Sequence, residues 1–95
     1  MQELTHYIGG AHVKGTSGRF ADVYNPATGE VQAKVPLANA DEMAQAVAIA
    51  AKAQPAWAAV NPQRRARVMM AFVGLLNRDI DKLAEALSRE HGKTL

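Results

Sequence analysis

The uncharged run from Val68 to Leu76 constrains the fold more than any other part of this 95-residue sequence. It reads VMMAFVGLL, so a helix over it would be apolar on every side, whereas a surface helix ordinarily keeps a polar half. Asn61-Pro62 begins this helix, because Asn is a favoured N-cap and Pro at the first helical position loses no hydrogen bond. The sequence therefore predicts an unusually apolar helix over residues 62–77.

A shorter amphipathic helix follows the break at residues 77–79. Apolar residues recur at helical spacing, and charged residues lie between them. The apolar set is Ile80, Leu83, Ala84 and Leu87, and the charged set is Asp81, Lys82, Glu85 and Arg89. Gly92 is placed to end this helix, because glycine is favoured just after the last helical residue.

An alanine-rich helix precedes both. Asn39 is a good N-cap, and Glu42 lies three residues later, at the spacing of a capping box. The apolar face of this helix is predicted to comprise Met43, Val47, Ala50 and Ala51. Pro55 is expected to end or kink the helix. Ala56–Val60 is then predicted to form a short turn with Trp57 as its main anchor.

The first fourteen residues predict a β-hairpin. Thr5–Ile8 and Ala11–Lys14 are short runs that favour strands, and Gly9-Gly10 separates them. Two adjacent glycines supply the positive φ angles that a type I′ hairpin turn requires. A polar loop, Gly15–Gly18, comes next. It leads into a strand over Arg19–Tyr24.

That strand is expected to bury Phe20 and either Val23 or Tyr24. Asn25–Gly29 follows and reads NPATG, with Asn first, Pro second and Gly last, an order typical of a turn. A second hairpin is therefore predicted around this turn.

Val31–Val35 alternates apolar and polar residues, as does a strand with one solvated face. Pro36 ends this strand or marks it as an edge strand. The predicted fold class is therefore α+β, with two N-terminal β-hairpins followed by three helices. Residues 1–37 form the hairpin segment and residues 38–95 the helical segment.

Composition excludes several function classes. Eleven basic and nine acidic residues give a net charge of +2, which is too balanced to favour nucleic acid or an anionic membrane as a partner. Cys is absent, so there is no disulfide, thiolate metal site or thiol nucleophile. No uncharged stretch approaches the roughly 20 residues of a membrane-spanning helix. No secretory signal is visible, and a cytoplasmic location is expected.

Most candidate site residues have simple structural explanations. His6 and His12 flank the hairpin turn, but no third metal ligand lies near them in the sequence, so both are expected to be solvated or loosely packed. His91 is expected to favour the C-terminal end of its helix. Asp79, Asp81 and Glu85 are interleaved with basic residues and are expected to form a solvated face, and Ser17 and Ser88 lack the sequence context of a nucleophile.

Arg64, Arg65 and Arg67 form the most suggestive cluster. They could bind phosphate, but neither interleaved aromatic residues nor a wider basic surface accompanies them. Because cations are unfavourable at a helix N-terminus, carboxylates of the same fold are expected to hold them. Gly9-Gly10 does not extend to a dinucleotide-binding motif. No catalytic, cofactor-binding or metal-binding residue is predicted in this chain.

Four segments together resemble the N-terminal part of the aldehyde dehydrogenase superfamily. They read HYIGGAHV, FADVYNPATGEVQAKVPLANADEMAQAV, QPAWAAVNPQRRARVMMAF and LSREHGKTL, and the resemblance covers Thr5 to Leu95. NPATGE and the E-x-G-K of Glu90–Lys93 are superfamily features. QPAWAAVNPQRRARV with SREHGKT is similar to the CoA-acylating methylmalonate-semialdehyde dehydrogenases.

The resemblance implies a fold, a reaction and cofactors. Members are much longer NAD-dependent α/β enzymes that oxidise malonate or methylmalonate semialdehyde in steps such as those of valine catabolism. A cysteine nucleophile forms a thiohemiacetal, hydride passes to NAD, and CoA releases an acyl-CoA. The resemblance places this chain on the cofactor-binding domain, as an N-terminal fragment without the nucleophile or the NAD site.

As a fragment, this chain is expected to be inactive alone, with the remainder of the dehydrogenase and further copies of the enzyme as its partners. In some relatives the residues matching Val23, Tyr24 and an Asp at position 90 hold a monovalent cation. Glu90 replaces that Asp here, so no cation site is predicted. The alternative is a self-contained protein-interaction module that uses the apolar helix over residues 62–77.

Overall fold

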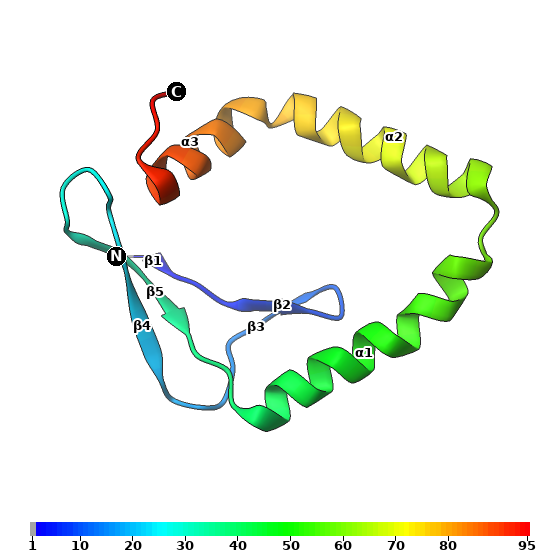
Figure 1. Ribbon diagram of the computed structural model, residues 1–95, viewed down its shortest axis with the longest axis horizontal. Coiled ribbons are helices and arrows are strands. Elements are labelled where there is room, and N and C mark those ends of the chain that lie inside the picture. The colour runs from blue at the N-terminus through cyan, green and yellow to red at the C-terminus, as the bar shows by residue number, and fades with distance from the viewer. Residues whose placement is uncertain (1) are drawn as a thin grey trace. The chain divides into compact units, whose positions relative to one another are not determined.

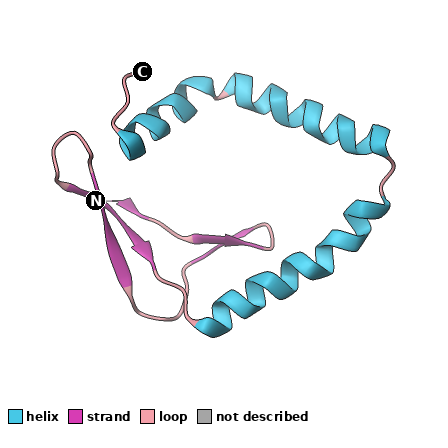
Figure 2. Cartoon of the chain, in the orientation of Figure 1, coloured by secondary structure: helices cyan, strands magenta, loops and turns pink. Residues whose placement is uncertain are grey.

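The computed structural model describes residues 2–95, in which five short strands precede three helices (Figures 1 and 2). The strands are β1 (Gln2–Glu3), β2 (His6–Ile8), β3 (Ala11–Val13), β4 (Phe20–Tyr24) and β5 (Val31–Pro36). The helices are α1 (Ala40–Ala59), α2 (Pro62–Arg78) and α3 (Ile80–His91). This order confirms the predicted α+β class.

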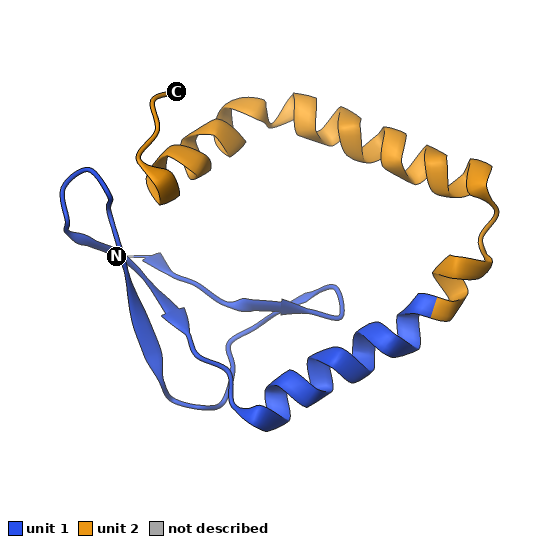
Figure 3. Ribbon diagram, viewed as in Figure 1, with its two compact units in different colours: residues 1–54 blue, residues 55–95 orange. Residues whose placement is uncertain are grey.

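The chain divides into two compact units, residues 1–54 and residues 55–95 (Figure 3). Unit 1 contains all the strands and most of α1, and unit 2 contains the end of α1 with α2 and α3. The division lies inside α1. The predicted segments 1–37 and 38–95 mark instead where strands give way to helices, and their place in a cofactor-binding domain stays a prediction.

The first predicted hairpin is confirmed. Strands β2 and β3 pair antiparallel, with Tyr7 opposite His12. Gly9 and Gly10 have φ angles of 62° and 82°, so both turn residues adopt the left-handed backbone that glycine accommodates readily.

The second hairpin is also confirmed, and it belongs to a three-stranded sheet in the order β1-β5-β4. Its turn is closed by Asn25, whose side-chain Oδ1 accepts a hydrogen bond from the Ala27 N–H at 2.9 Å and whose carbonyl accepts one from the Gly29 N–H at 2.7 Å. Because β5 is the central strand, Pro36 ends it and does not mark an edge.

The core of the sheet is small. Among residues 2–95 only Ala33 and Pro36, both in β5, are buried. Ala33 has 5% of its surface exposed. The prediction that Phe20 is buried is wrong, because its side chain is 46% exposed at one end of β4, while Val23 is half-buried. Two-residue β1, which pairs parallel with β5, is too short for sequence periodicity to reveal.

Helix α1 begins as predicted but continues further. Pro55 lies inside it and does not end it, so the predicted turn over residues 56–60 is wrong as far as Ala59. Most of that stretch is exposed, so water can solvate the carbonyl that Pro55 leaves without a donor. Trp57 is 43% exposed and is not an anchor.

The predicted apolar face of α1 is not covered by residues 2–95. Met43 and Val47 are 62% and 59% exposed. The half-buried positions are instead Glu42 and Ala46, one turn apart, and the side chain of Ile49 lies next to Gly9 of the hairpin. The side of α1 that meets the hairpin therefore carries Glu42 and Ile49, and not Met43 and Val47.

Unit 2 has the predicted helices. The Asn61 side chain accepts a hydrogen bond from the Arg64 N–H at 2.9 Å, and Pro62 is the first residue of α2. A single residue, Asp79, separates α2 from α3, and Gly92 caps α3 in the left-handed conformation. The large apolar side chains of residues 68–75 are all exposed.

Candidate functional site

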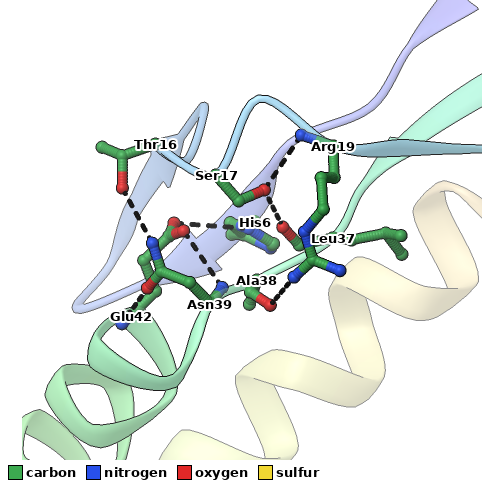
Figure 4. Close-up of polar contacts among 8 residues, drawn as sticks. All are labelled: His6, Thr16, Ser17, Arg19, Leu37, Ala38, Asn39 and Glu42. Carbon is green, nitrogen blue, oxygen red and sulfur yellow. Dashed lines mark hydrogen bonds and ion pairs between the residues drawn. The ribbon is translucent and has the colours of Figure 1, made fainter.

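A cluster of polar contacts in unit 1 joins the loop between β3 and β4 to the beginning of α1 (Figure 4). The predicted capping box lies at its centre. The Glu42 N–H donates to Asn39 Oδ1 at 2.8 Å, and the Asn39 N–H donates to Glu42 Oε1 at 3.3 Å. Asn39 also donates from Nδ2 to the Thr16 hydroxyl at 3.4 Å, so the cap fixes both the helix and the loop.

The same loop binds the end of β5 through main-chain carbonyl groups. The Ser17 hydroxyl donates a short hydrogen bond to the Leu37 carbonyl, and Arg19 Nη2 donates to the Ala38 carbonyl at 3.1 Å. The Leu37 N–H donates in return to the Arg19 carbonyl at 2.9 Å. The Ser17 hydroxyl and the Arg19 guanidinium are therefore engaged in structural hydrogen bonds.

The side chains of His6 and Glu42 lie close to each other and next to Gly15. Glu42 Oε2 lies 3.7 Å from His6 Nε2, and the two side chains are 11% and 19% exposed respectively. His6 Nε2 has no hydrogen-bond partner among residues 2–95. A Cβ on Gly15 would lie 3.0 Å from the Glu42 carboxylate and 3.1 Å from the His6 ring, so any larger residue would crowd these two side chains.

The Glu42 carboxylate is held ionised. Desolvation alone would raise its pKa, but the backbone N–H groups of Asn39 and Thr16, the His6 ring and the Thr16 hydroxyl outweigh desolvation and lower that pKa. A carboxylate with a lowered pKa suits the positive end of α1. It is poorly suited to general acid catalysis near neutral pH.

Two surface pockets adjoin this region, and neither brings reactive groups together. One, of about 310 Å³, is bordered by the loop over residues 14–19 together with Glu3, Phe20 and Pro36. The other, of about 300 Å³, is bordered by Gln2, Glu3, Phe20 and Lys34. Since the Ser17 hydroxyl and the Arg19 guanidinium already bind carbonyl groups, the cluster is a structural clasp, named here the loop–helix clasp.

The two hairpin histidines have separate partners. His12 Nδ1 lies 3.0 Å from the Thr5 hydroxyl, and its ring makes an edge contact with Tyr7 at 5.2 Å between centroids. No group of three or more metal-ligating side chains occurs in residues 2–95. The expectation that both histidines are solvated or loosely packed is wrong for His6, because the loop–helix clasp covers its ring.

The prediction that carboxylates of the same fold hold the arginine cluster is not met within residues 2–95. Within residues 2–95 no carboxylate forms an ion pair with Arg64, Arg65 or Arg67. The described ion pairs of unit 2 join Arg78 to Asp79 and Arg89 to Glu85. The expected carboxylates of the same fold are therefore not supplied by this part of the chain.

The remaining sequence candidates lie in regular elements. Val23 and Tyr24 end β4 in unit 1, whereas Glu90 lies in α3 of unit 2. His91 is the last residue of α3, as expected. The residues that sequence reasoning missed are Gly15, Thr16 and Ser17, whose contacts depend on tertiary structure and leave no local pattern beyond a polar loop.

Comparison with known proteins now places the chain. The model of the aldehyde dehydrogenase family matches residues 12–95. The chain belongs to the aldehyde dehydrogenase family. It is 43% identical over 95 residues to the malonate-semialdehyde dehydrogenase of Pseudomonas aeruginosa, of which it covers 19%. It is 46% identical over 92 residues to the mitochondrial acylating methylmalonate-semialdehyde dehydrogenase of Arabidopsis thaliana, of which it covers 15%.

A solved aldehyde dehydrogenase has the same local fold. The structure, named as a methylmalonate-semialdehyde dehydrogenase from Sinorhizobium meliloti 1021 complexed with NAD, superposes with a TM-score of 0.90 at 60% identity. The match covers 96% of this chain and 18% of that one. This aldehyde dehydrogenase chain therefore spans less than a fifth of that relative, and the loop–helix clasp belongs to that shared segment.

Proposed function

We propose that this chain is the N-terminal part of an NAD-dependent, CoA-acylating dehydrogenase that oxidises malonate or methylmalonate semialdehyde to an acyl-CoA. The observation that carries the proposal is the 60% identity, at a TM-score of 0.90, to a methylmalonate-semialdehyde dehydrogenase solved with NAD. With methylmalonate semialdehyde as its substrate, the enzyme would serve valine catabolism. The whole enzyme is proposed to be a cytoplasmic homo-oligomer. Separately, the helices of residues 2–95 include none with the length and hydropathy of a membrane span.

This chain contains neither the nucleophile of the proposed reaction nor a glycine-rich dinucleotide loop. There is no cysteine to form a covalent intermediate. The paired glycines lie in a hairpin turn and precede a strand, whereas a glycine-rich dinucleotide loop precedes a helix. The proposal therefore assigns catalysis, NAD and CoA to the remainder of the dehydrogenase and an architectural role to this segment.

The architectural role is specific. The loop–helix clasp holds the loop over residues 14–19 and the beginning of α1 together through contacts between residues distant in sequence. The alternative, a self-contained interaction module built on the helix over residues 62–77, is not favoured, because almost the whole chain matches one segment of much longer dehydrogenases.

The test is a chimera in which residues 1–95 replace the matching segment of the Sinorhizobium meliloti enzyme. With NAD, CoA and malonate or methylmalonate semialdehyde, the chimera should form NADH and acyl-CoA at close to the parental rate. The isolated chain should form neither, which serves as the control. A folded chimera that oxidises neither semialdehyde, or an isolated chain that reduces NAD, would contradict the proposal.

A further inference from the structure

Arg65 carries a polar atom that no residue from 2 to 95 satisfies. Its Nε has essentially no exposed surface and no hydrogen-bond partner among residues 2–95. The first turn of α2 contains no acidic residue, so nothing there offsets three arginines at the positive end of the helix. A covered guanidinium nitrogen without an acceptor is costly, which distinguishes Arg65 from its exposed neighbours Arg64 and Arg67.

Helical geometry places Arg65 at the head of an apolar stripe. Residues four, seven and eleven positions later share its side of the helix. These are Met69, Phe72 and Leu76, and together with Arg65 they are named here the Arg65 stripe. Met69 and Phe72 are about half exposed, and no residue from 2 to 95 covers them more fully.

The composition of the stripe specifies what can cover it. A partner that buries Phe72 and Met69 would also desolvate Arg65 at the end of the stripe. A desolvated guanidinium is costly unless an opposite charge pairs with it, and a carboxylate does so best, through two parallel hydrogen bonds. The charge of Arg65 therefore excludes a purely apolar partner. The apolar side chains of the stripe exclude a purely polar partner.

We propose that the Arg65 stripe docks against the remainder of the dehydrogenase and that a carboxylate from that remainder pairs with Arg65. This rests on the proposed function. The remainder is favoured as the occupant because the chain spans only 18% of the solved relative, which leaves most of that protein to supply the partner surface. It also explains why the carboxylates expected around the arginines are not in this segment.

The test uses the full-length chimera with Arg65→Met, which removes the charge but keeps an unbranched apolar side chain. Breaking a buried ion pair should lower the apparent Tm by roughly 10 °C and speed hydrogen exchange along α2. Arg65→Lys should lose less, because it keeps the charge but not the paired geometry. Arg67→Met is the matched control, since Arg67 shares its side of the helix with Ala71, Gly74 and Arg78.

The outcomes separate the two proposals. If Arg65→Met melts and exchanges like Arg67→Met, the inference is wrong whether or not the chimera is active. If Arg65→Met changes only the oligomeric state and leaves α2 exchange unaltered, the carboxylate belongs to a second copy, which also overturns it. Should Arg65→Met fail to fold, Arg65→Lys supplies the exchange readout. An inactive chimera with Arg65 intact contradicts the proposed function alone.

Discussion

The two units of this chain are stabilised in different ways. In unit 1 several side-chain contacts join residues far apart in sequence, such as Lys34 to Asp22, Arg19 to Ala38 and Ser17 to Leu37. The described ion pairs of unit 2 join residues at most four apart, Arg89 to Glu85 and Arg78 to Asp79. These long-range contacts of unit 1 therefore fix tertiary structure, whereas the described ion pairs of unit 2 stabilise helices.

Apolar residues show the same contrast. Unit 1 buries little, but its two buried residues, Ala33 and Pro36, both lie in the central strand of a sheet. No residue of α2 or α3 is buried. Helical propensity and caps alone leave isolated helices of this length marginal in water. Under the proposed function, unit 2 takes its packing from the remainder of the enzyme.

The largest effect is expected at Gly15 in unit 1. Its φ of 84° is unfavourable for any other residue, and a new Cβ would lie 3.0 Å from the Glu42 carboxylate. Gly15→Ala should therefore reduce the free energy of unfolding by about 2–5 kcal/mol, combining backbone strain with overpacking. Urea unfolding of the full-length chimera followed by circular dichroism measures this loss.

Gly18→Ala is the control for that substitution. Gly18 has a φ of 70°, but nothing lies within 4 Å of the position that an added Cβ would take, so only the backbone cost of about 1–2 kcal/mol is expected. Equal losses for the two alanine variants would show that the loop–helix clasp does not depend on the space at Gly15.

The two N-caps give the next largest effect. Asn39 and Asn61 each accept a hydrogen bond from the N–H three residues later, but only Asn39 also binds the loop through Thr16. Asn61→Ala should cost about 1 kcal/mol and Asn39→Ala about 2 kcal/mol. Hydrogen exchange should report fraying confined to α2 for the first and loosening of both α1 and the loop for the second. If Asn39→Ala frayed α1 alone and left the loop unchanged, the predicted difference between the two N-caps would be wrong.

Local structure can be predicted from sequence where its causes are local. Asn39 and Glu42 are three residues apart, and Gly9-Gly10 and Asn25–Gly29 carry their turn chemistry within a few residues. Caps and turns depend on such short spacings. The structure confirms each of these elements, and the helix break at Asp79 lies within the predicted residues 77–79.

Predictions that depend on what covers a surface fail. Met43, Val47 and Phe20 are apolar and periodic, yet they are exposed, because periodicity shows which side of an element is apolar and not whether this chain covers it. Pro55 carries a real local penalty, but the alanines around it favour the helix strongly enough to continue it to Ala59. The clasp around Gly15 requires tertiary contacts that no local pattern encodes.

Acid should weaken unit 1 through Glu42. Although desolvation opposes it, hydrogen bonding within the clasp lowers the folded-state pKa of Glu42 below its ordinary value of 4.5. The folded state then binds fewer protons than the unfolded state, so this contribution is fully present above about pH 4.5 and is lost as the pH falls through the folded pKa. Urea midpoints measured from pH 3 to pH 7 should show the decline.

Glu42→Gln is the matched variant for the acid effect, because Gln also completes a capping box but does not titrate. Its urea midpoint should be lower than that of the unsubstituted protein at pH 7 and should approach it near pH 3. A Gln variant with the same pH profile as the original would assign the acid sensitivity to other carboxylates.

The smallest effect is expected in unit 2, where Arg89 Nη2 lies 2.7 Å from Glu85 Oε1 across one turn of α3. Both side chains are well exposed, so solvent screens the pair, and Glu85→Gln should cost only about 0.3–0.5 kcal/mol. The loss should disappear in 1 M salt, where charges are screened within a few ångströms. A loss of several kcal/mol that persists in high salt would mean that Glu85 holds tertiary structure, and the contrast between the two units would fail. An effect within the expected range would show that the polar contacts of α3 stabilise the helix itself and leave its packing to apolar surface.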